Sequence, residues 1–185
     1  MKNIFVLNKS RIASKSLVTF AAVCAAVALP QVFHWLGLAS GLGNGLGAAF
    51  LPMHIPVFIA AFMAGPAVGL AAGVLSPLVS FGISGMPTGA LLPFMVIELA
   101  GYGLIAGFLY KSKTPVFVNL IIAQLAGRVL RAGAVLVSVY ALESGVISVQ
   151  SIWNTITAGL PGILLQMALI PLLMYRIRGL KERLD

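Results

Sequence analysis

The sequence is poor in charged residues, and this shortage sets its class. Only 9% of the 185 residues are Asp, Glu, Lys or Arg, whereas a soluble domain has about 25%. The single cysteine, Cys24, excludes a disulfide or a cluster of thiolate metal ligands within the chain. Hydrophobic residues make up 60% of the chain, and its mean hydropathy is +1.06. We therefore predict an all-α integral membrane protein.

Motifs for catalysis and nucleotide binding are missing as well. The sequence has no Gly-x-x-x-x-Gly-Lys-Ser/Thr loop for ATP phosphates, no Gly-x-Ser-x-Gly turn and no His-Glu-x-x-His helix. Two of its four carboxylates, Glu182 and Asp185, lie in the C-terminal tail after the sixth apolar segment. We expect neither an enzyme nor a bound cofactor.

Long apolar segments dominate what is present. Six of them occur, at residues 17–36, 52–64, 66–83, 89–110, 115–142 and 152–175. Because about 20 helical residues cross a bilayer core, the chain has room for six spans and little else. The second segment is short for a full crossing and joins the third through Gly65 and Pro66, a turn signal. We predict a single transmembrane domain of six helices over residues 1–185.

The basic residues indicate how the spans are oriented. Ten of the twelve fall before the first segment, between the fourth and fifth, or after the sixth, and six spans bring all three groups to one side. The positive-inside rule makes that side cytoplasmic, so both termini are predicted to be cytoplasmic. These residues are Lys2, Lys9, Arg11, Lys15, Lys111, Lys113, Arg176, Arg178, Lys181 and Arg183.

The other two basic residues, Arg128 and Arg131, interrupt the fifth apolar segment. An arginine at the centre of a spanning helix costs about 2.5–3.5 kcal/mol on insertion scales, so the pair needs a reason. By helical rise, Arg128 lies roughly 20 Å from the cytoplasmic boundary, and Glu98 lies roughly 14 Å from the outer one. Since these depths are similar, we predict that Glu98 pairs with Arg128 and that Arg131 is left as a surplus positive charge.

Several further polar side chains are expected near these charges. Gln124 shares a helical face with both arginines, and Tyr102 lies one turn from Glu98. Because guanidinium groups suit carboxylates and phosphates, the site favours a small organic anion or a zwitterion with an acidic group. The alternative is a Glu98–Arg128 clamp that only joins two helices. The predicted substrate-binding residues are His54, Glu98, Tyr102, Gln124, Arg128, Arg131, Trp153 and Asn154.

Small residues recur four positions apart on two segments, a spacing that lets helices approach closely in lipid. On the third segment, Gly65, Gly69 and Gly73 form a stripe for which we predict internal packing. A glycine-rich stretch at residues 37–47 is expected outside, where it could fold over a pocket. On the first segment the small residues form two Ala-x-x-x-Ala pairs: Ala21, Ala22, Ala25 and Ala26.

The order of several short motifs resembles a known family. The chain has Leu-Pro-Met-His-Ile-Pro at 51–56, Ala-Gly-Pro at 64–66, Ser-Pro-Leu at 76–78, Ser-Gly-Met-Pro at 84–87 and Glu-Leu-Ala-Gly-Tyr-Gly at 98–103. With six spans and the alanine pairs of the first, this series is similar to the vitamin-type S components of energy-coupling factor (ECF) transporters. The similarity extends over nearly the whole chain.

The resemblance implies a function and partners. S components of this kind are substrate-binding subunits in the cell (plasma) membrane of prokaryotes, and they capture a vitamin or related micronutrient from outside. Their pocket is made by the outer halves of spans four to six and the loop between spans one and two, here residues 37–50 with the predicted site. A transmembrane coupling subunit and two ATP-binding subunits complete the importer, and the docking residues would be Ala21, Ala22, Ala25 and Ala26.

The substrate itself stays open. Pantothenate or lipoate fits a surplus arginine, while riboflavin, pyridoxine, cobalamin or haem is also compatible, and a haem would use His34 and His54. Biotin is not favoured, because the Gly-Pro-Thr-Gly-Gly-Tyr element of biotin-type members is missing. The alternatives from other classes are a self-sufficient carrier or channel and a non-transporting structural subunit.

Overall fold

The chain folds into a bundle of helices in the computed structural model. The structure describes the backbone at residues 2–43, 45–143 and 145–184, and side chains at 11–43, 45–143, 145–177 and 179. These ranges contain no strand, which confirms the predicted all-α class. The elements are α1 (Lys2–Ala39), α2 (Gly45–Phe50), α3 (His54–Ala64), α4 (Pro66–Ser84), α5 (Leu92–Phe108), the 3₁₀ turn η1 (Leu109–Lys111), α6 (Val116–Leu136), the π-helical turn η2 (Val137–Ala141), α7 (Gln150–Ala158) and α8 (Leu160–Leu184).

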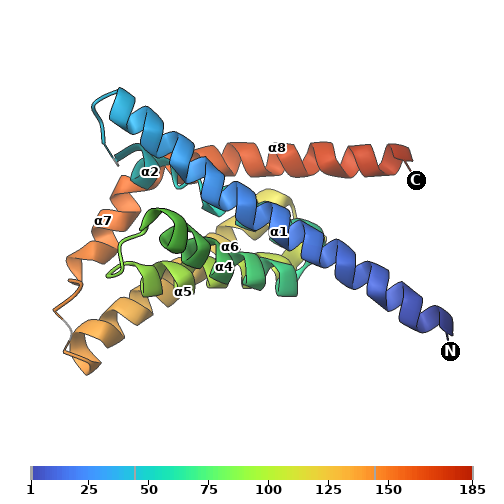
Figure 1. Ribbon diagram of the computed structural model, residues 1–185, viewed down its shortest axis with the longest axis horizontal. Helices are drawn as coiled ribbons and strands as arrows, with labels where there is room; N and C mark the ends of the chain where they lie inside the picture. The colour runs from blue at the N-terminus through green and yellow to red at the C-terminus, as the bar shows by residue number, and fades with distance from the viewer. Residues whose placement is uncertain (1, 44, 144, 185) are drawn as a thin grey trace.

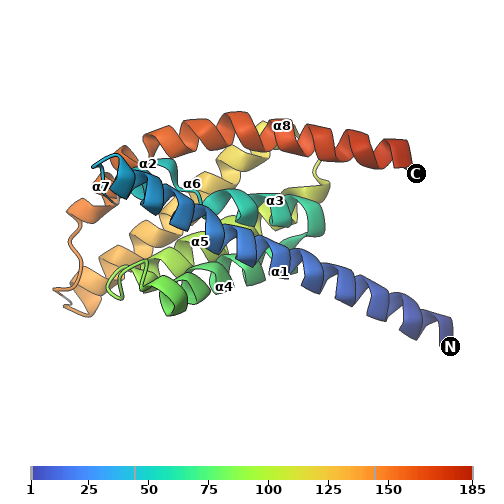
Figure 2. The same cartoon turned by 45° about the horizontal axis from the view of Figure 1, so that its top comes forward.

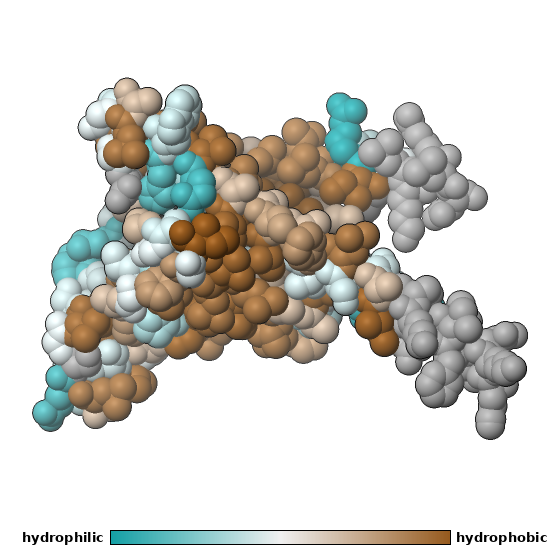
Figure 3. Space-filling model, in the orientation of Figure 1, coloured by the Kyte–Doolittle hydropathy of each residue, from teal (hydrophilic) through white to brown (hydrophobic). Residues whose placement is uncertain are grey.

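Six helical stretches of the described chain are long and apolar enough to cross a membrane, as predicted. The start of α1 and the end of α8 lie at the same end of the bundle, as an even number of spans requires (Figures 1 and 2). Apolar residues cover the middle of the face shown in Figure 3, and many hydrophilic residues lie at the end that carries α7. Which end faces the cytoplasm stays a prediction. The six stretches are Arg11–Ala39, Gly45–Ala64, Pro66–Ser84, Leu92–Lys111, Val116–Ala141 and Leu160–Ile177.

The second span is longer than the sequence predicted. It combines α2 and α3 into 20 residues, Gly45–Ala64, with a short turn between them where Leu51 has a φ of 49°. This length is enough for a crossing. The first part was expected to be loop because it is rich in glycine.

The sixth span begins later than predicted. Residues 152–158 belong to α7, which is turned away from the direction of α8, and the candidate span is Leu160–Ile177 (Figure 1). Gly159 follows the end of α7, and Pro161, which has no backbone N–H, lies at the start of α8. The prediction of one continuous helix from residue 152 was therefore wrong.

α4 and α5 pack with their backbones in direct contact, a region we call the α4–α5 seam (Gly69, Gly73, Leu99 and Gly103). A Cβ atom added to Gly69 would lie 2.1 Å from the carbonyl oxygen of Gly103, and one added to Gly73 would lie 2.3 Å from that of Leu99. Only glycine permits so close an approach. The internal packing predicted for the glycine stripe is confirmed.

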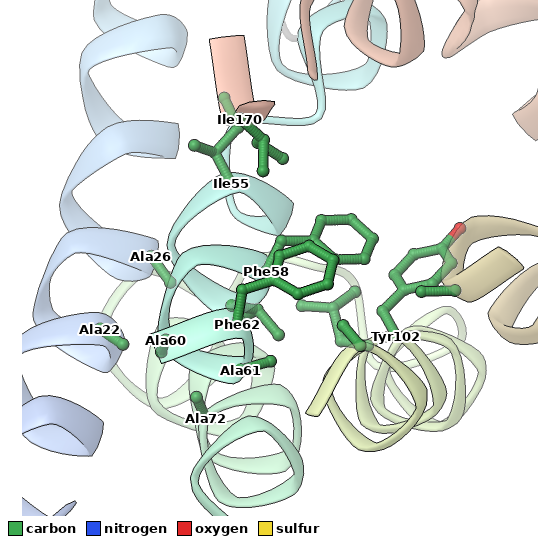
Figure 4. Packing of buried hydrophobic residues seen from close by; sticks show 14 of the residues in the cluster. Ala22, Ala26, Ile55, Phe58, Ala60, Ala61, Phe62, Ala72, Tyr102 and Ile170 are labelled. Atoms are coloured by element: carbon green, nitrogen blue, oxygen red, sulfur yellow. The ribbon is translucent and has the colours of Figure 1, made fainter. Parts of the chain in front are cut away.

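One side of α1 packs into the interior of the bundle. Ala22 and Ala26 point toward α3, which also contributes Ala60 to this core (Figure 4). On the other side of α3, the ring centroid of Phe58 lies 5.1 Å from that of Tyr102 on α5. This core fixes α5 against α3 and so sets the position of Glu98, one turn from Tyr102.

Candidate functional site

A cavity of about 460 Å³ is lined in part by α7, which lies at the end of the bundle opposite to the start of α1 (Figure 1). This volume is within the range of about 300–1,000 Å³ that is common for small-molecule sites. The walls come from every helix except α8, together with the α4–α5 connection, and most of their surface is apolar. The polar residues in the lining are His34, His54, Ser80, Glu98, Arg131, Ser151, Asn154 and Thr155.

Glu98 and Arg131 form a buried ion pair in the cavity wall. Nη1 of Arg131 lies 2.8 Å from Oε2 of Glu98, and Nη2 donates a hydrogen bond of 3.0 Å to Oγ1 of Thr155. The Tyr102 hydroxyl donates a hydrogen bond of 2.6 Å to Oε1 of Glu98. Both carboxylate oxygens therefore have a partner, and the two charges offset each other inside the protein.

The predicted pairing of Glu98 with Arg128 is wrong, and so is the prediction that Arg131 is the surplus charge. A Cβ added to Gly127 would lie 2.3 Å from the Tyr102 ring, so Gly127 and Tyr102 set the register between the antiparallel helices α6 and α5. One turn further along both helices, the residue opposite Glu98 is Arg131. An estimate of depth from helical rise does not separate two arginines less than a turn apart, because tilt shifts depth by a similar amount.

Arg128 itself is half-buried and is not among the residues that line the cavity. No hydrogen bond or ion pair joins it to another residue in the described ranges. Its predicted role in substrate binding therefore has no contact to support it.

Several buried polar atoms of the cavity wall have no hydrogen-bond partner among the residues that the structure describes. They are both ring nitrogens of His54, Nδ1 of His34, Nε of Arg131 and Oγ of Ser151. Burying a polar atom without a partner costs about 1–3 kcal/mol, so such atoms are rare. These four residues line one cavity, which is the arrangement expected where a bound molecule supplies the missing hydrogen bonds.

The other predicted site residues are divided between the cavity and its surroundings. Asn154 lines the cavity, and Tyr102 lies behind Glu98. Gln124 is buried outside the lining, where its side-chain nitrogen donates a hydrogen bond of 2.9 Å to Oε1 of Gln166. Trp153 is 63% exposed and does not line the cavity.

Three residues of the lining carried little signal in the sequence. Ser151 and Thr155 lie one turn apart on α7, and Oγ1 of Thr155 also donates a hydrogen bond of 2.8 Å to the carbonyl oxygen of Ser151. Hydroxyl residues are common in helices, so this spacing alone did not distinguish them. Met86 belongs to the Ser-Gly-Met-Pro motif at 84–87 and lies in the α4–α5 connection, and its place in the lining depends on how that connection folds back.

The four alanines predicted to dock a partner face in two directions. Ala22 and Ala26 are 7% and 0% exposed, so the prediction that they contact a partner is wrong for this structure. They lie on the side of α1 that packs against the bundle, whereas Ala21 is exposed and Ala25 is half-buried. The docking role stays a prediction for Ala21 and Ala25 alone.

A family model for the substrate-specific component of ECF transporters matches residues 15–176. The chain belongs to this family. The matched range includes every residue that lines the cavity. No curated protein and no solved structure gives a significant match.

As an S component, the protein is a membrane-embedded part of a transporter. Components of this family bind small-molecule substrates and work with a membrane coupling subunit and ATPases. The resemblance to the S components of ECF transporters is thereby confirmed. The missing ATP-binding loop agrees with this division of labour.

Proposed function

We propose that this S component captures a vitamin-like small molecule in the cavity that every helix except α8 lines, for ATP-driven uptake. The observation that carries the proposal is the group of unpartnered polar atoms in a mostly apolar cavity of ligand size. The positive-inside prediction places this end of the bundle outside the cell, where a substrate for import arrives.

The acidic group predicted for the substrate is not part of this proposal. It was expected because Arg131 was thought to be free, and the ion pair with Glu98 removes that surplus charge from the cavity wall. The geometry supports a bound molecule and gives no support to an acidic one.

For delivery, we propose that the coupling subunit docks on the outward side of α1 around Ala21 and Ala25. Small side chains on an exposed helix face allow close helix packing within a membrane. A mostly apolar groove of about 820 Å³ runs between α1 and α4. Its lining includes Phe20, Cys24 and Ala71.

The direct test is to identify the small molecule that co-purifies with the protein by mass spectrometry and then to measure its binding and its uptake. We expect the S component alone to bind it, and uptake to require the coupling subunit and the ATPases. Flux of the same molecule into liposomes that contain only this chain would contradict the proposal.

A matched pair of variants places the binding in the cavity. His54→Ala is expected to weaken binding at least about tenfold, because it removes the buried imidazole whose nitrogens lack partners. Trp153→Ala is the control, since this neighbouring side chain is exposed and outside the lining. Equal losses in the two variants would place the site elsewhere.

A further inference from the structure

We infer that the substrate of this site is an uncharged, mainly apolar molecule that carries both hydrogen-bond donors and acceptors along one edge. The inference rests on the proposed function and adds the chemical class of the substrate. Three features of the cavity lead to it: its charges, its unpartnered polar atoms and its apolar wall.

The charges of the wall are paired within the protein. Among the residues that line the cavity, Glu98 and Arg131 are the charged ones, and they contact each other at 2.8 Å. An anion would have to compete with Glu98 for the guanidinium, and a cation would have to compete with Arg131 for the carboxylate. Away from water, the member of the pair left behind would be an uncompensated buried charge, which is strongly unfavourable.

Arg128 lies close enough to the wall for its charge to act on His54, but it is not part of the lining. It lies on the same helix as Arg131 but outside the lining, so no described contact brings its guanidinium to a molecule in the cavity. A charged substrate would thus meet no free opposite charge among the lining residues.

The unpartnered atoms of the wall can be matched only by a molecule that has hydrogen-bond donors as well as acceptors. Nε of Arg131 is a donor, so it needs an acceptor such as a carbonyl oxygen. A neutral imidazole has one donor and one acceptor nitrogen, and both nitrogens of His54 lack a partner. A carboxylate or phosphate has only acceptors when fully ionised and would leave the acceptor nitrogen of His54 unmatched. An amide or a heterocycle with an N–H beside a carbonyl satisfies both kinds of atom.

The rest of the cavity wall is apolar and fits the apolar part of the substrate. Methionine side chains adapt their shape to flat or irregular apolar groups and make favourable contacts with aromatic rings. The apolar residues that line the cavity include Pro30, Met53, Met86, Pro87, Leu91 and Met95.

The test uses the full chain in lipid nanodiscs and two measurements. The first is the identity of the molecule that denaturation releases from the purified protein; we expect it to carry no ionised carboxylate or phosphate. The second is thermal stabilisation by probe pairs that differ in one ionised group: riboflavin and its 5′-phosphate, nicotinamide and nicotinate, panthenol and pantothenate. We expect stabilisation only by uncharged members.

The outcomes separate the two proposals. Release of an anionic molecule, or a charged member that stabilises as strongly as its uncharged partner, overturns the inference and leaves the proposed function standing. If no molecule is released and no probe stabilises the protein, the proposed function falls and the inference falls with it.

A variant gives an independent check. Arg128→Gln removes the positive charge nearest to Arg131 on α6 without touching the lining, so affinity for the co-purified molecule should change less than about threefold. A loss of about 30-fold or more would show that a charge on the bound molecule is attracted by Arg128, and would overturn the inference.

Discussion

Helix α5 has two very different surroundings along its length. From Leu99 to Gly103 its backbone touches that of α4 in the α4–α5 seam, so closely that a single added carbon atom would clash. One turn away, at Met95 and Glu98, the same helix faces a cavity whose wall holds unpartnered polar atoms. The seam leaves no space between the two backbones, whereas the cavity leaves space and has polar atoms without hydrogen-bond partners in its wall. The contrast indicates that rigid packing of one half holds the polar side chains of the other half in place.

The largest effect is expected from breaking the seam. Gly103→Leu places a side chain where a Cβ alone would lie 2.0 Å from the carbonyl oxygen of Gly69, so the helices must separate. We expect a loss of more than about 4 kcal/mol in unfolding free energy and no folded protein by size-exclusion chromatography in detergent.

The matched control for the seam is Gly82→Ala on α4, where an added Cβ meets no other atom within 4 Å. This variant should fold normally, because alanine is favoured over glycine in a helix. A folded Gly103→Leu protein that still binds its co-purified molecule would show that the seam does not hold the cavity in place.

The next effect concerns the two arginines. Arg131→Ala leaves Glu98 buried without its ionic partner and should cost about 3–5 kcal/mol in unfolding free energy, with loss of binding. Arg128→Ala removes no described contact and should cost less than about 1 kcal/mol. Thermal unfolding in detergent compares the two, and the reverse order would restore the Glu98–Arg128 pairing.

A smaller effect is expected at the buried amide pair beside the cavity. Gln166→Leu leaves the side chain of Gln124 without its partner and should cost about 1–3 kcal/mol. Replacing both glutamines by leucine removes the two polar groups together, so the double variant should be more stable than Gln166→Leu alone. If the double variant loses as much unfolding free energy as the two single variants together, the two glutamines act independently.

The smallest effect on stability is expected on the outward side of α1. Ala21→Leu lies on an exposed position, so unfolding free energy should change by about 0.5 kcal/mol or less while uptake by the assembled transporter falls. The control is Ala22→Leu, one residue further on, which overpacks the core and should cost about 1–3 kcal/mol. If uptake persists in Ala21→Leu, the coupling subunit docks elsewhere.

Sequence reasoning went furthest where one helix decides the outcome. The apolar segments predicted six spans, and the glycines of α4 predicted close packing. Glu98 was selected because it is a rare charge at membrane depth, and it does line the cavity. Prediction failed where two helices must be placed against each other. It paired Glu98 with Arg128, whereas the contact at Gly127 sets a register between α5 and α6 that pairs Glu98 with Arg131.

The amino-acid sequence by itself determined the class, the number of spans and the family of this protein, because hydropathy and motif order are properties of the chain alone. Only the tertiary structure decided which arginine pairs with Glu98, which side of α1 is buried and where α7 breaks from α8. Those outcomes depend on contacts between segments that are far apart in the chain. They are decided by how two helices are offset against each other, by one helical turn or less. The close contact at Gly127 sets the register between α5 and α6. In this register Arg131, which was predicted to be a free charge, forms an ion pair with Glu98.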